Sequence, residues 1–383
     1  MSVTAARGFL AGGVAAGIKE SGDRDLALVV NHGPSRAAAG VFTSNRVQAA
    51  PVRWSRRVLS DGRITAVVLN SGGANACTGQ AGAVDALLMA EHTARVVDTV
   101  PHEVAVCSTG LIGVRLPMDR VMAGITACGG ALSPEGGEDA AVAIKTTDSV
   151  HKSAVVTRAG WTVGGMAKGA GMLAPGLATM LVVLTTDADV SADALDPALR
   201  TAVRTTFDRV DSDGCMSTND TVLLLASGAS GTVPDAEEFA EAVHAVCLDL
   251  ARQLIADAEG ASKEIEVTVV GAATEEDAVE VGRSVARNNL LKCALHGEDP
   301  NWGRVLSAIG TTSAVFDPDR LDVAINDVWV CRNGAAGESR DKVDLSGRSV
   351  TITVDLCSGD SSAVIWTNDL TAEYVHENSA YSS

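Results

Sequence analysis

The stretch Met166 to Met180, rich in glycine, is expected to form a loop that runs into an apolar segment, and Thr179 stands at the junction. Its glycines permit positive φ angles and close backbone approach. Pro175 fixes its own φ and favours extended geometry at Ala174. The apolar run Met180 to Leu184 is typical of a buried strand. The pattern predicts a tight, irregular loop that leads into a strand starting at or near Thr179.

A second candidate for chemistry follows the short strand predicted over Val104 to Cys107. A Thr-Gly pair there, Thr109 and Gly110, could offer a hydroxyl and a backbone N–H to an oxyanion. A plain turn is the alternative. The strand predicted over Ile64 to Leu69 likewise runs into the polar, glycine-rich residues 70–79, which fit either an active-site loop or an ordinary turn.

An acidic residue, Glu259, ends the clearest helical pattern of the chain, over residues 234–260. Phe239, Val243, Val246 and Leu250 recur at spacings of three or four and form one apolar face. The helix dipole disfavours an anion at the carboxyl end. Glu259 is therefore either a solvated surface residue or an acid placed for a cationic ligand.

Metal and nucleotide chemistry is not indicated. The glycine-rich residues 8–19 lack the Gly-Lys-Thr ending of a phosphate loop, which favours a close-packed strand or turn. Asp211, Asp213 and Asn219 are not part of a twelve-residue calcium loop ending in Glu. The seven histidines and eight cysteines show neither His-x-x-x-His nor Cys-x-x-Cys spacing. We expect no metal and no cofactor.

The predicted elements that hold these residues follow a mixed α/β order, with sheets covered by helices. At 383 residues the chain can form two domains or one large layered domain. Thr274 and Asp277 resemble a capping box that opens a helix reaching about Leu295. Further strands are expected over Leu26 to Val30, Ala38 to Thr43, Val222 to Leu225, Glu264 to Val269, Leu321 to Val328, Ser349 to Leu356 and Ser362 to Thr367.

Charge narrows the classes of partner. The formal net charge is −18 at pH 7, whereas nucleic acid and anionic membranes attract clustered Lys and Arg. We expect neither as a partner. We read no signal peptide at the N-terminus and no apolar run long enough to span a membrane. A cytoplasmic protein with reduced cysteines is therefore expected.

Several motifs together resemble one family. They are Lys168 to Pro175 with Leu177 to Leu181; Asn70 to Gly79; Ser108 to Gly113; Thr146 to Asp148; Ala258 to Lys263; Asp299 to Arg304; and the tail Glu377 to Ser383. The chain resembles the ornithine acetyltransferase family, also called the bifunctional arginine biosynthesis protein family, over nearly its whole length. It departs from the family at Gly176-Leu177, where Asn or Asp followed by Met is more usual.

The resemblance implies a fold and a processing step. The fold is a layered αββα sandwich of the self-cleaving N-terminal-nucleophile-like type, with a smaller α/β domain in the C-terminal half. The Thr179 hydroxyl attacks the Ala178 carbonyl, and hydrolysis of the resulting ester leaves an α chain of residues 1–178 and a β chain of residues 179–383. Both chains contribute to the sandwich, and two copies of each form the assembly.

The resemblance also implies a ping-pong reaction. The freed α-amine of Thr179 accepts the hydroxyl proton of the same residue, because an α-amine titrates at about 7.7–8.0 against about 10.4 for lysine. Thr179 takes an acetyl group from N-acetylornithine and releases ornithine. Glutamate then accepts the acetyl group and leaves as N-acetylglutamate. Thr109 and Gly110 are implied to stabilise the oxyanions.

The substrate contacts are implied by resemblance alone. Glu259 is implied to take the side-chain ammonium of the substrate, which overrides its interpretation as a surface residue. The others are Lys168, one of Thr146 and Thr147, and in the tail Asn378 and Ser383. The tail, which would otherwise be expected to fray, is then ordered.

Three alternatives remain open. A bifunctional enzyme would also take acetyl groups from acetyl-CoA. An N-terminal-nucleophile amidase or peptidase would pass the acyl group to water. A non-catalytic paralogue would bind ligand without self-cleavage.

Overall fold

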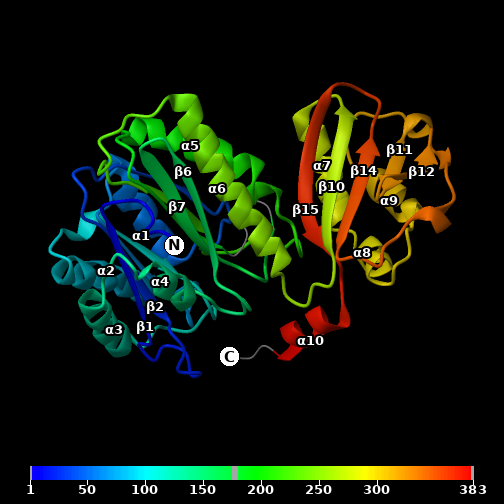
Figure 1. Cartoon of the computed structure of the whole chain (residues 1–383). Coiled ribbons are helices and arrows are strands. Elements are labelled where there is room, and N and C mark those ends of the chain that lie inside the picture. Colours follow the sequence, from blue (N-terminus) through cyan, green and yellow to red (C-terminus); the bar gives the residue numbers. More distant parts are fainter. Residues whose placement is uncertain (1, 175–179, 381–383) are drawn as a thin grey trace. The chain divides into compact units, whose positions relative to one another are not determined.

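The structure, a computed structural model, describes residues 2–174 and 180–380, so Ala178, Thr179 and Ser383 lie outside the described residues. The chain divides into two compact units (Figure 1). The first comprises Met1–Asp208 and Cys215–Leu254, and the second Arg209–Gly214 and Ile255–Ser383.

The first unit contains two sheets. The four-stranded sheet has the order β1-β2-β4-β5, built from β1 Phe9–Val14, β2 Leu26–Asn31, β4 Ala66–Asn70 and β5 Val104–Ser108. The five-stranded sheet has the order β3-β9-β8-β7-β6, built from β3 Ala38–Phe42, β9 Thr221–Ala226, β8 Leu181–Thr186, β7 Trp161–Lys168 and β6 Lys152–Arg158. The helices are α1 Ala50–Val58, α2 Gly79–Val96, α3 Met118–Gly130, α4 Gly137–Ala143, α5 Ala192–Thr205 and α6 Ala236–Ala256.

The two sheets face each other across one apolar core. Met166, Leu181 and Val183 of the five-stranded sheet share that core with the strands of the four-stranded sheet. On the outer faces, α2 and α3 pack against the four-stranded sheet and α5 packs against β3. A Cβ on Gly165 of β7 would touch Val246 and Leu250, so α6 lies directly over this strand. The predicted αββα layering is confirmed for this unit.

The segment that holds Thr179 joins two neighbouring strands of the five-stranded sheet. Strand β7 ends at Lys168 and pairs antiparallel with β8, with Lys168 opposite Leu181. The prediction that Met166–Lys168 begins an irregular loop was wrong, because these residues complete β7. Gly164 serves close packing there, since a Cβ would lie 2.3 Å from the Ser2 carbonyl oxygen.

The second unit is the predicted smaller α/β domain. Its sheet has the order β13-β12-β11-β14-β10-β15, from β10 Glu264–Ala272, β11 Asp322–Ile325, β12 Val328–Arg332, β13 Ala335–Ala336, β14 Ser349–Asp355 and β15 Ser361–Asn368. Its helices are α7 Glu275–Ala286, α8 Asn289–His296, α9 Trp302–Ile309 and α10 Ala372–Ala380. Helix α7 packs on β10 and β15, and the inward residues of β10 alternate as predicted. Short 3₁₀ helices span Leu59–Asp61, Pro101–Glu103, Phe207–Arg209, Pro318–Arg320 and Arg340–Lys342.

Two predicted elements of the second unit are interrupted. The strand expected over Leu321 to Val328 is a hairpin, because Asn326 and Asp327 adopt positive φ angles of 44° and 64° and reverse the chain. The helix opened by the confirmed Thr274 cap stops at Ala286, and Asn288 caps a new helix by accepting the Leu291 N–H.

Glu259 does not end helix α6. The helix stops at Ala256, and Glu259 lies in the following turn, where Gly260 has φ +62°. A glycine with positive φ commonly follows a helix end, but Gly260 shapes a separate turn beyond the end of α6.

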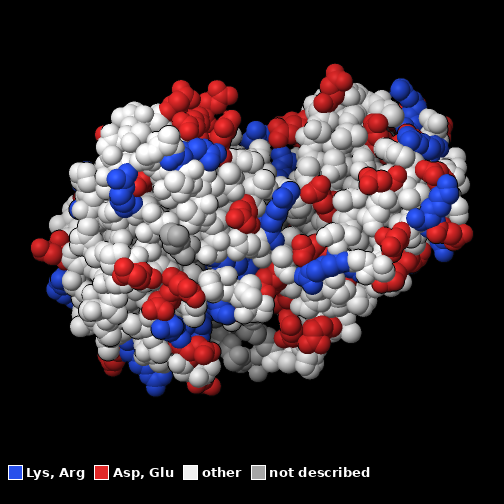
Figure 2. Space-filling model, viewed as in Figure 1, with Lys and Arg blue, Asp and Glu red and all other residues white. Residues whose placement is uncertain are grey.

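The surface charge and the apolar character of the helices can be described for the residues that the structure covers. On the face seen in Figure 2, the acidic and basic side chains are interspersed and form no broad basic patch among the described residues. None of the helices within residues 2–174 and 180–380 has the length and apolar character needed to cross a membrane.

Candidate active site

Thr109 and Gly110 extend from the end of β5 into a tight backbone crossing. Gly110 has φ +127°, and a Cβ there would lie 2.5 Å from the Gly73 nitrogen, so only glycine fits. Thr109 is 2% exposed. A threonine hydroxyl and a backbone N–H at such a turn are the kinds of donor that can stabilise an oxyanion.

The loop over residues 70–79 supports these donors. The Asn70 carbonyl accepts the Thr109 N–H at 3.0 Å, and Gly73 N–H donates to the Thr109 carbonyl at 3.0 Å. The Asn70 side-chain oxygen accepts the Ser108 hydroxyl at 2.6 Å. The sequence left open whether residues 70–79 form an active-site loop or an ordinary turn. In the structure this loop supports the Thr109–Gly110 turn through hydrogen bonds.

Lys168 lies in a buried network with Asp148 and Lys152. Its Nζ is 3.8 Å from Asp148 Oδ2, and Lys152 Nζ donates to Asp148 Oδ1 at 2.7 Å. Lys168 is 2% exposed and Lys152 is fully buried. The Gly169 and Thr146 N–H groups also donate to this carboxylate, at 2.6 and 2.9 Å. The loop with Thr146 and Thr147 is thereby tied to the end of β7.

The partners of Asp148 determine its charge. Burial raises the pKa of its carboxyl, but the charges of Lys168 and Lys152, with hydrogen bonds from Lys152 and Thr146, outweigh burial and hold the pKa well below its ordinary value. An ionised Asp148 in turn is a counter-ion for both buried lysines. This arrangement can present one fixed cation, at Lys168, beside the Gly169–Ala174 segment.

Met180, the first described residue after Thr179, is anchored to the start of β9. Its N–H donates to Asp220 Oδ1 at 3.1 Å, and its carbonyl accepts the Thr221 N–H at 3.2 Å. The residue next to the predicted nucleophile is therefore held by a buried side chain as well as by the strand ladder.

In the second unit, two of the predicted substrate residues meet. Asn378 Nδ2 donates to Glu259 Oε2 at 2.9 Å. Helix α10 lies against the Glu259 turn, since a Cβ on Gly260 would be 2.3 Å from the Tyr374 nitrogen. The Thr371 hydroxyl donates to the Gly260 carbonyl at 2.7 Å. The tail is helical through Ala380, as the family resemblance implied.

Helix α10 adds negative potential beside Glu259. Burial raises the pKa of Glu377, and the charges of Glu259 and Glu373 raise it further. A bound ammonium group would relieve this repulsion. The surroundings of Glu259 therefore suit a cation.

The predicted site residues thus form two groups, one in each unit. Thr109, Gly110, Thr146, Thr147 and Lys168 belong to the first unit, and Glu259 and Asn378 to the second. The sequence reasoning missed Asp148, Lys152, Asn219 and Asp220 as supporting residues. Asp148 belongs to the motif Thr146 to Asp148, but the sequence analysis gave it no role. Its spacing of four residues from Lys152 could have indicated an ion pair.

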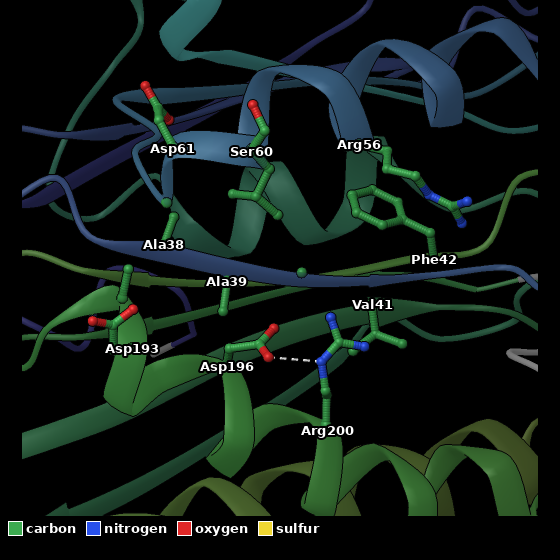
Figure 3. Close-up of a pocket in the computed structure, with 14 residues that line it drawn as sticks. Ala38, Ala39, Val41, Phe42, Arg56, Ser60, Asp61, Asp193, Asp196 and Arg200 are labelled. Carbon is green, nitrogen blue, oxygen red and sulfur yellow. Dashed lines mark hydrogen bonds and ion pairs between the residues drawn. The ribbon is translucent and has the colours of Figure 1, made fainter.

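A cavity of about 540 Å³ lies elsewhere in the first unit, beside edge strand β3 (Figure 3). Its charged side chains include Arg56, Asp193, Asp196 and Arg200. Arg200 is paired with Asp196 at 2.7 Å, and the guanidinium of Arg56 stacks over the Phe42 ring. None of the predicted site residues lines this cavity, so it carries no part of the proposed chemistry.

Comparison with known proteins was made over the whole chain. The model of the ArgJ family matches residues 10–383. Proteins named arginine biosynthesis bifunctional protein ArgJ from Streptomyces coelicolor and Streptomyces avermitilis are each 72% identical over 383 residues, covering 100% of this chain and of the relative. Among solved structures, ornithine acetyltransferase complexed with ornithine, from Mycobacterium tuberculosis, is 55% identical over 47% of this chain and 96% of that chain, with a TM-score of 0.45.

Relatives that match from the first residue to the last, together with a family model that matches nearly as far, lead to one conclusion: the chain belongs to the ArgJ family.

Proposed function

We propose that this chain is an ornithine acetyltransferase of arginine biosynthesis, which cleaves itself between Ala178 and Thr179 and then transfers acetyl groups through Thr179. The observation that carries the proposal is the full-length identity of 72% with relatives named arginine biosynthesis bifunctional protein. The motif around Thr179 lies in this matched region. The arrangement of donors and charges in both units supports it.

Self-cleavage creates the catalytic base. The Thr179 hydroxyl oxygen bonds to the Ala178 carbonyl carbon, the C–N bond between the two residues breaks, and the nitrogen leaves as an amine. Water then hydrolyses the ester and frees the hydroxyl. The new α-amine accepts the hydroxyl proton in each later attack, which a threonine inside a chain cannot achieve alone.

Transfer then proceeds in two balanced steps. Thr179 oxygen attacks the acetyl carbon of N-acetylornithine, and ornithine leaves after its nitrogen takes a proton. The amine of glutamate attacks the acetyl ester, N-acetylglutamate leaves, and the hydroxyl is restored. Thr109 and Gly110 stabilise both oxyanions. Each such donor contributes about 3–4 kcal/mol to lowering the barrier.

Recognition uses opposite charges. The substrate carries an ammonium group that suits Glu259, which Asn378 holds by a hydrogen bond. It also carries a carboxylate that suits Lys168, whose Nζ lies 3.8 Å from Asp148 Oδ2. One of Thr146 and Thr147 adds a contact, and Ser383 closes the site. The cut chains assemble as two α and two β chains in the cytoplasm, without a cofactor.

Mass spectrometry of Thr179→Ala tests the nucleophile. The variant should remain one chain of 383 residues and transfer no acetyl group, whereas the unmodified protein should give two chains. Two chains from the variant would refute the assignment. Glu259→Gln should weaken N-acetylornithine binding more than self-cleavage, and an equal loss of both would indicate a folding defect.

The nature of the acceptor separates transfer from hydrolysis. With N-acetylornithine and glutamate, a transferase forms N-acetylglutamate, whereas an amidase forms acetate with or without glutamate. The relatives are named bifunctional, and a second activity with acetyl-CoA as donor is the alternative to test. Release of CoA when glutamate is the acceptor would establish that activity, and its absence would leave N-acetylornithine as the donor.

A further inference from the structure

Two adjacent polar side chains, Asn219 and Asp220, are buried immediately before strand β9. They are 4% and 0% exposed. The proposed reaction assigns them no role. Polar groups this deeply buried are normally fully hydrogen-bonded, so each unusual contact here calls for a physical reason.

Asn219 connects β9 to the predicted oxyanion donors. Its Nδ2 donates to the Ser108 carbonyl at 2.8 Å and to the Ala74 carbonyl at 2.6 Å. Its side-chain oxygen accepts the Thr218 hydroxyl at 2.6 Å. Ser108 directly precedes Thr109, so this one amide fixes the turn that carries both donors.

Asp220 connects the same point of the chain to the segment of the nucleophile. Its Oδ1 accepts the Met180 N–H at 3.1 Å, and its backbone carbonyl accepts the Thr43 N–H at 3.0 Å. Met180 follows Thr179 directly in the sequence. Asn219 thus holds the turn of the proposed oxyanion donors, and the next residue, Asp220, holds Met180 beside the proposed nucleophile.

The second oxygen of Asp220, Oδ2, is buried and has no hydrogen-bond partner in the described part of the chain. Burial raises the pKa of Asp220 well above its ordinary value, and the charge of Asp208 raises it further. The Met180 N–H, the Ser217 hydroxyl and the charge of Lys168 act in the opposite direction. A protonated carboxyl can accept at one oxygen and donate from the other.

We propose that Asn219 and Asp220 are positioning residues that hold the nucleophile and the oxyanion donors at a fixed separation, with Asp220 acting as an uncharged hydrogen-bonding group. This inference rests on the proposed function. Catalysis by an oxyanion site depends on donor placement, and a displacement near 1 Å can lower a rate about 100-fold. A rigid dipeptide that holds both partners prevents such a displacement.

The Asp220→Asn variant tests whether Asp220 acts as an uncharged group. An asparagine side chain keeps an acceptor at one atom and a donor at the other but has no titrating proton. In the purified full chain, Asp220→Asn should self-cleave and keep kcat within about threefold of the unmodified protein, with an unchanged pH profile. Asp220→Ala and Asn219→Ala should lower kcat about 100-fold with little change in KM. Asp196→Asn, at an exposed position of helix α5, is the control and should behave like the unmodified protein.

Each contrary result identifies its own cause. If Asp220→Asn loses as much kcat as Asp220→Ala, or loses one limb of the pH profile, the carboxyl works as a charge and the inference is overturned. If both alanine variants keep the full kcat, positioning is refuted while the proposed function stands. If the unmodified protein neither cleaves itself nor transfers acetyl groups, the proposed function itself fails.

Discussion

Two carboxyls of the first unit, Asp148 and Asp220, are similarly buried yet have opposite pKa shifts. Asp148 accepts hydrogen bonds from Lys152, Gly169 and Thr146, and its pKa is lowered. Asp220 accepts the Met180 N–H, its second oxygen has no partner in the described part of the chain, and its pKa is raised. Both lie beside the segment that holds Thr179.

The difference shows that burial alone does not determine ionisation. Two buried ammonium groups compensate the charge of Asp148, so its ionised form persists and fixes the position of Lys168. At Asp220 burial outweighs the opposing charge of Lys168, so the neutral form is favoured and Asp220 serves as an uncharged tether. One site organises a cation, and the other organises the backbone.

Removing the charge of Asp148 should cause the largest loss of stability among the substitutions considered for these two carboxyls. Asp148→Asn removes the carboxylate that Lys152 and Lys168 share in the interior, which should lower the free energy of unfolding by about 3–5 kcal/mol. Urea unfolding of the purified variant measures this. Asp196→Asn, which breaks an exposed pair with Arg200, should cost at most about 1 kcal/mol. Equal losses in the two variants would contradict the account of Asp148.

Replacing Lys152 and Lys168 separately should distinguish an effect on stability from an effect on catalysis. Lys152 Nζ lies 2.7 Å from Asp148 and is fully buried, so Lys152→Met should reduce stability more than Lys168→Met. Lys168 is the proposed substrate contact, so Lys168→Met should lower kcat/KM at least about tenfold. Unfolding curves and steady-state kinetics on both variants measure the two effects. The reverse order of the two variants in either measurement would contradict the roles given to Lys152 and Lys168.

The smallest effect concerns pH. The raised pKa of Asp220 means that its contribution to stability is full below the unfolded value of about 3.9 and is lost as pH rises toward the folded value. Asp220→Asn has no such loss, so its melting temperature relative to the unmodified protein should increase from about pH 5 to about pH 8. Asp148 behaves oppositely, because its contribution is present above the unfolded pKa and disappears in acid. A difference in melting temperature that stays flat with pH would indicate an ionised Asp220.

Apolar periodicity and caps predicted individual helices and strands well, because these signals act locally, whereas the αββα layering followed from the family resemblance. The Thr274 cap and the alternation of Glu264–Ala272 are examples of such local signals. These signals failed where a short polar turn interrupts an apolar pattern, as at Asn326-Asp327, or where a helix stops without a strong signal, as at Ala256. Asn and Asp tolerate positive φ, so the turn at Asn326-Asp327 follows from local turn chemistry, whereas no strong local signal marks the helix end at Ala256.

The supporting residues of the site were harder to predict for a physical reason. Asn219 reaches carbonyls at positions 74 and 108, and Asp220 reaches position 180. Such contacts join strands far apart in the chain and leave no periodic pattern. Thr109 and Gly110 could be singled out because a hydroxyl followed by glycine at a strand end has a local signature, whereas a buried Asn-Asp pair reads as an ordinary polar turn.

The most direct measurement is the intact mass of the protein after incubation with N-acetylornithine, first alone and then with glutamate. The account predicts two chains, residues 1–178 and 179–383, with one acetyl group on the second chain that disappears when glutamate is added. A single continuous chain that still transfers acetyl groups at full rate would contradict it.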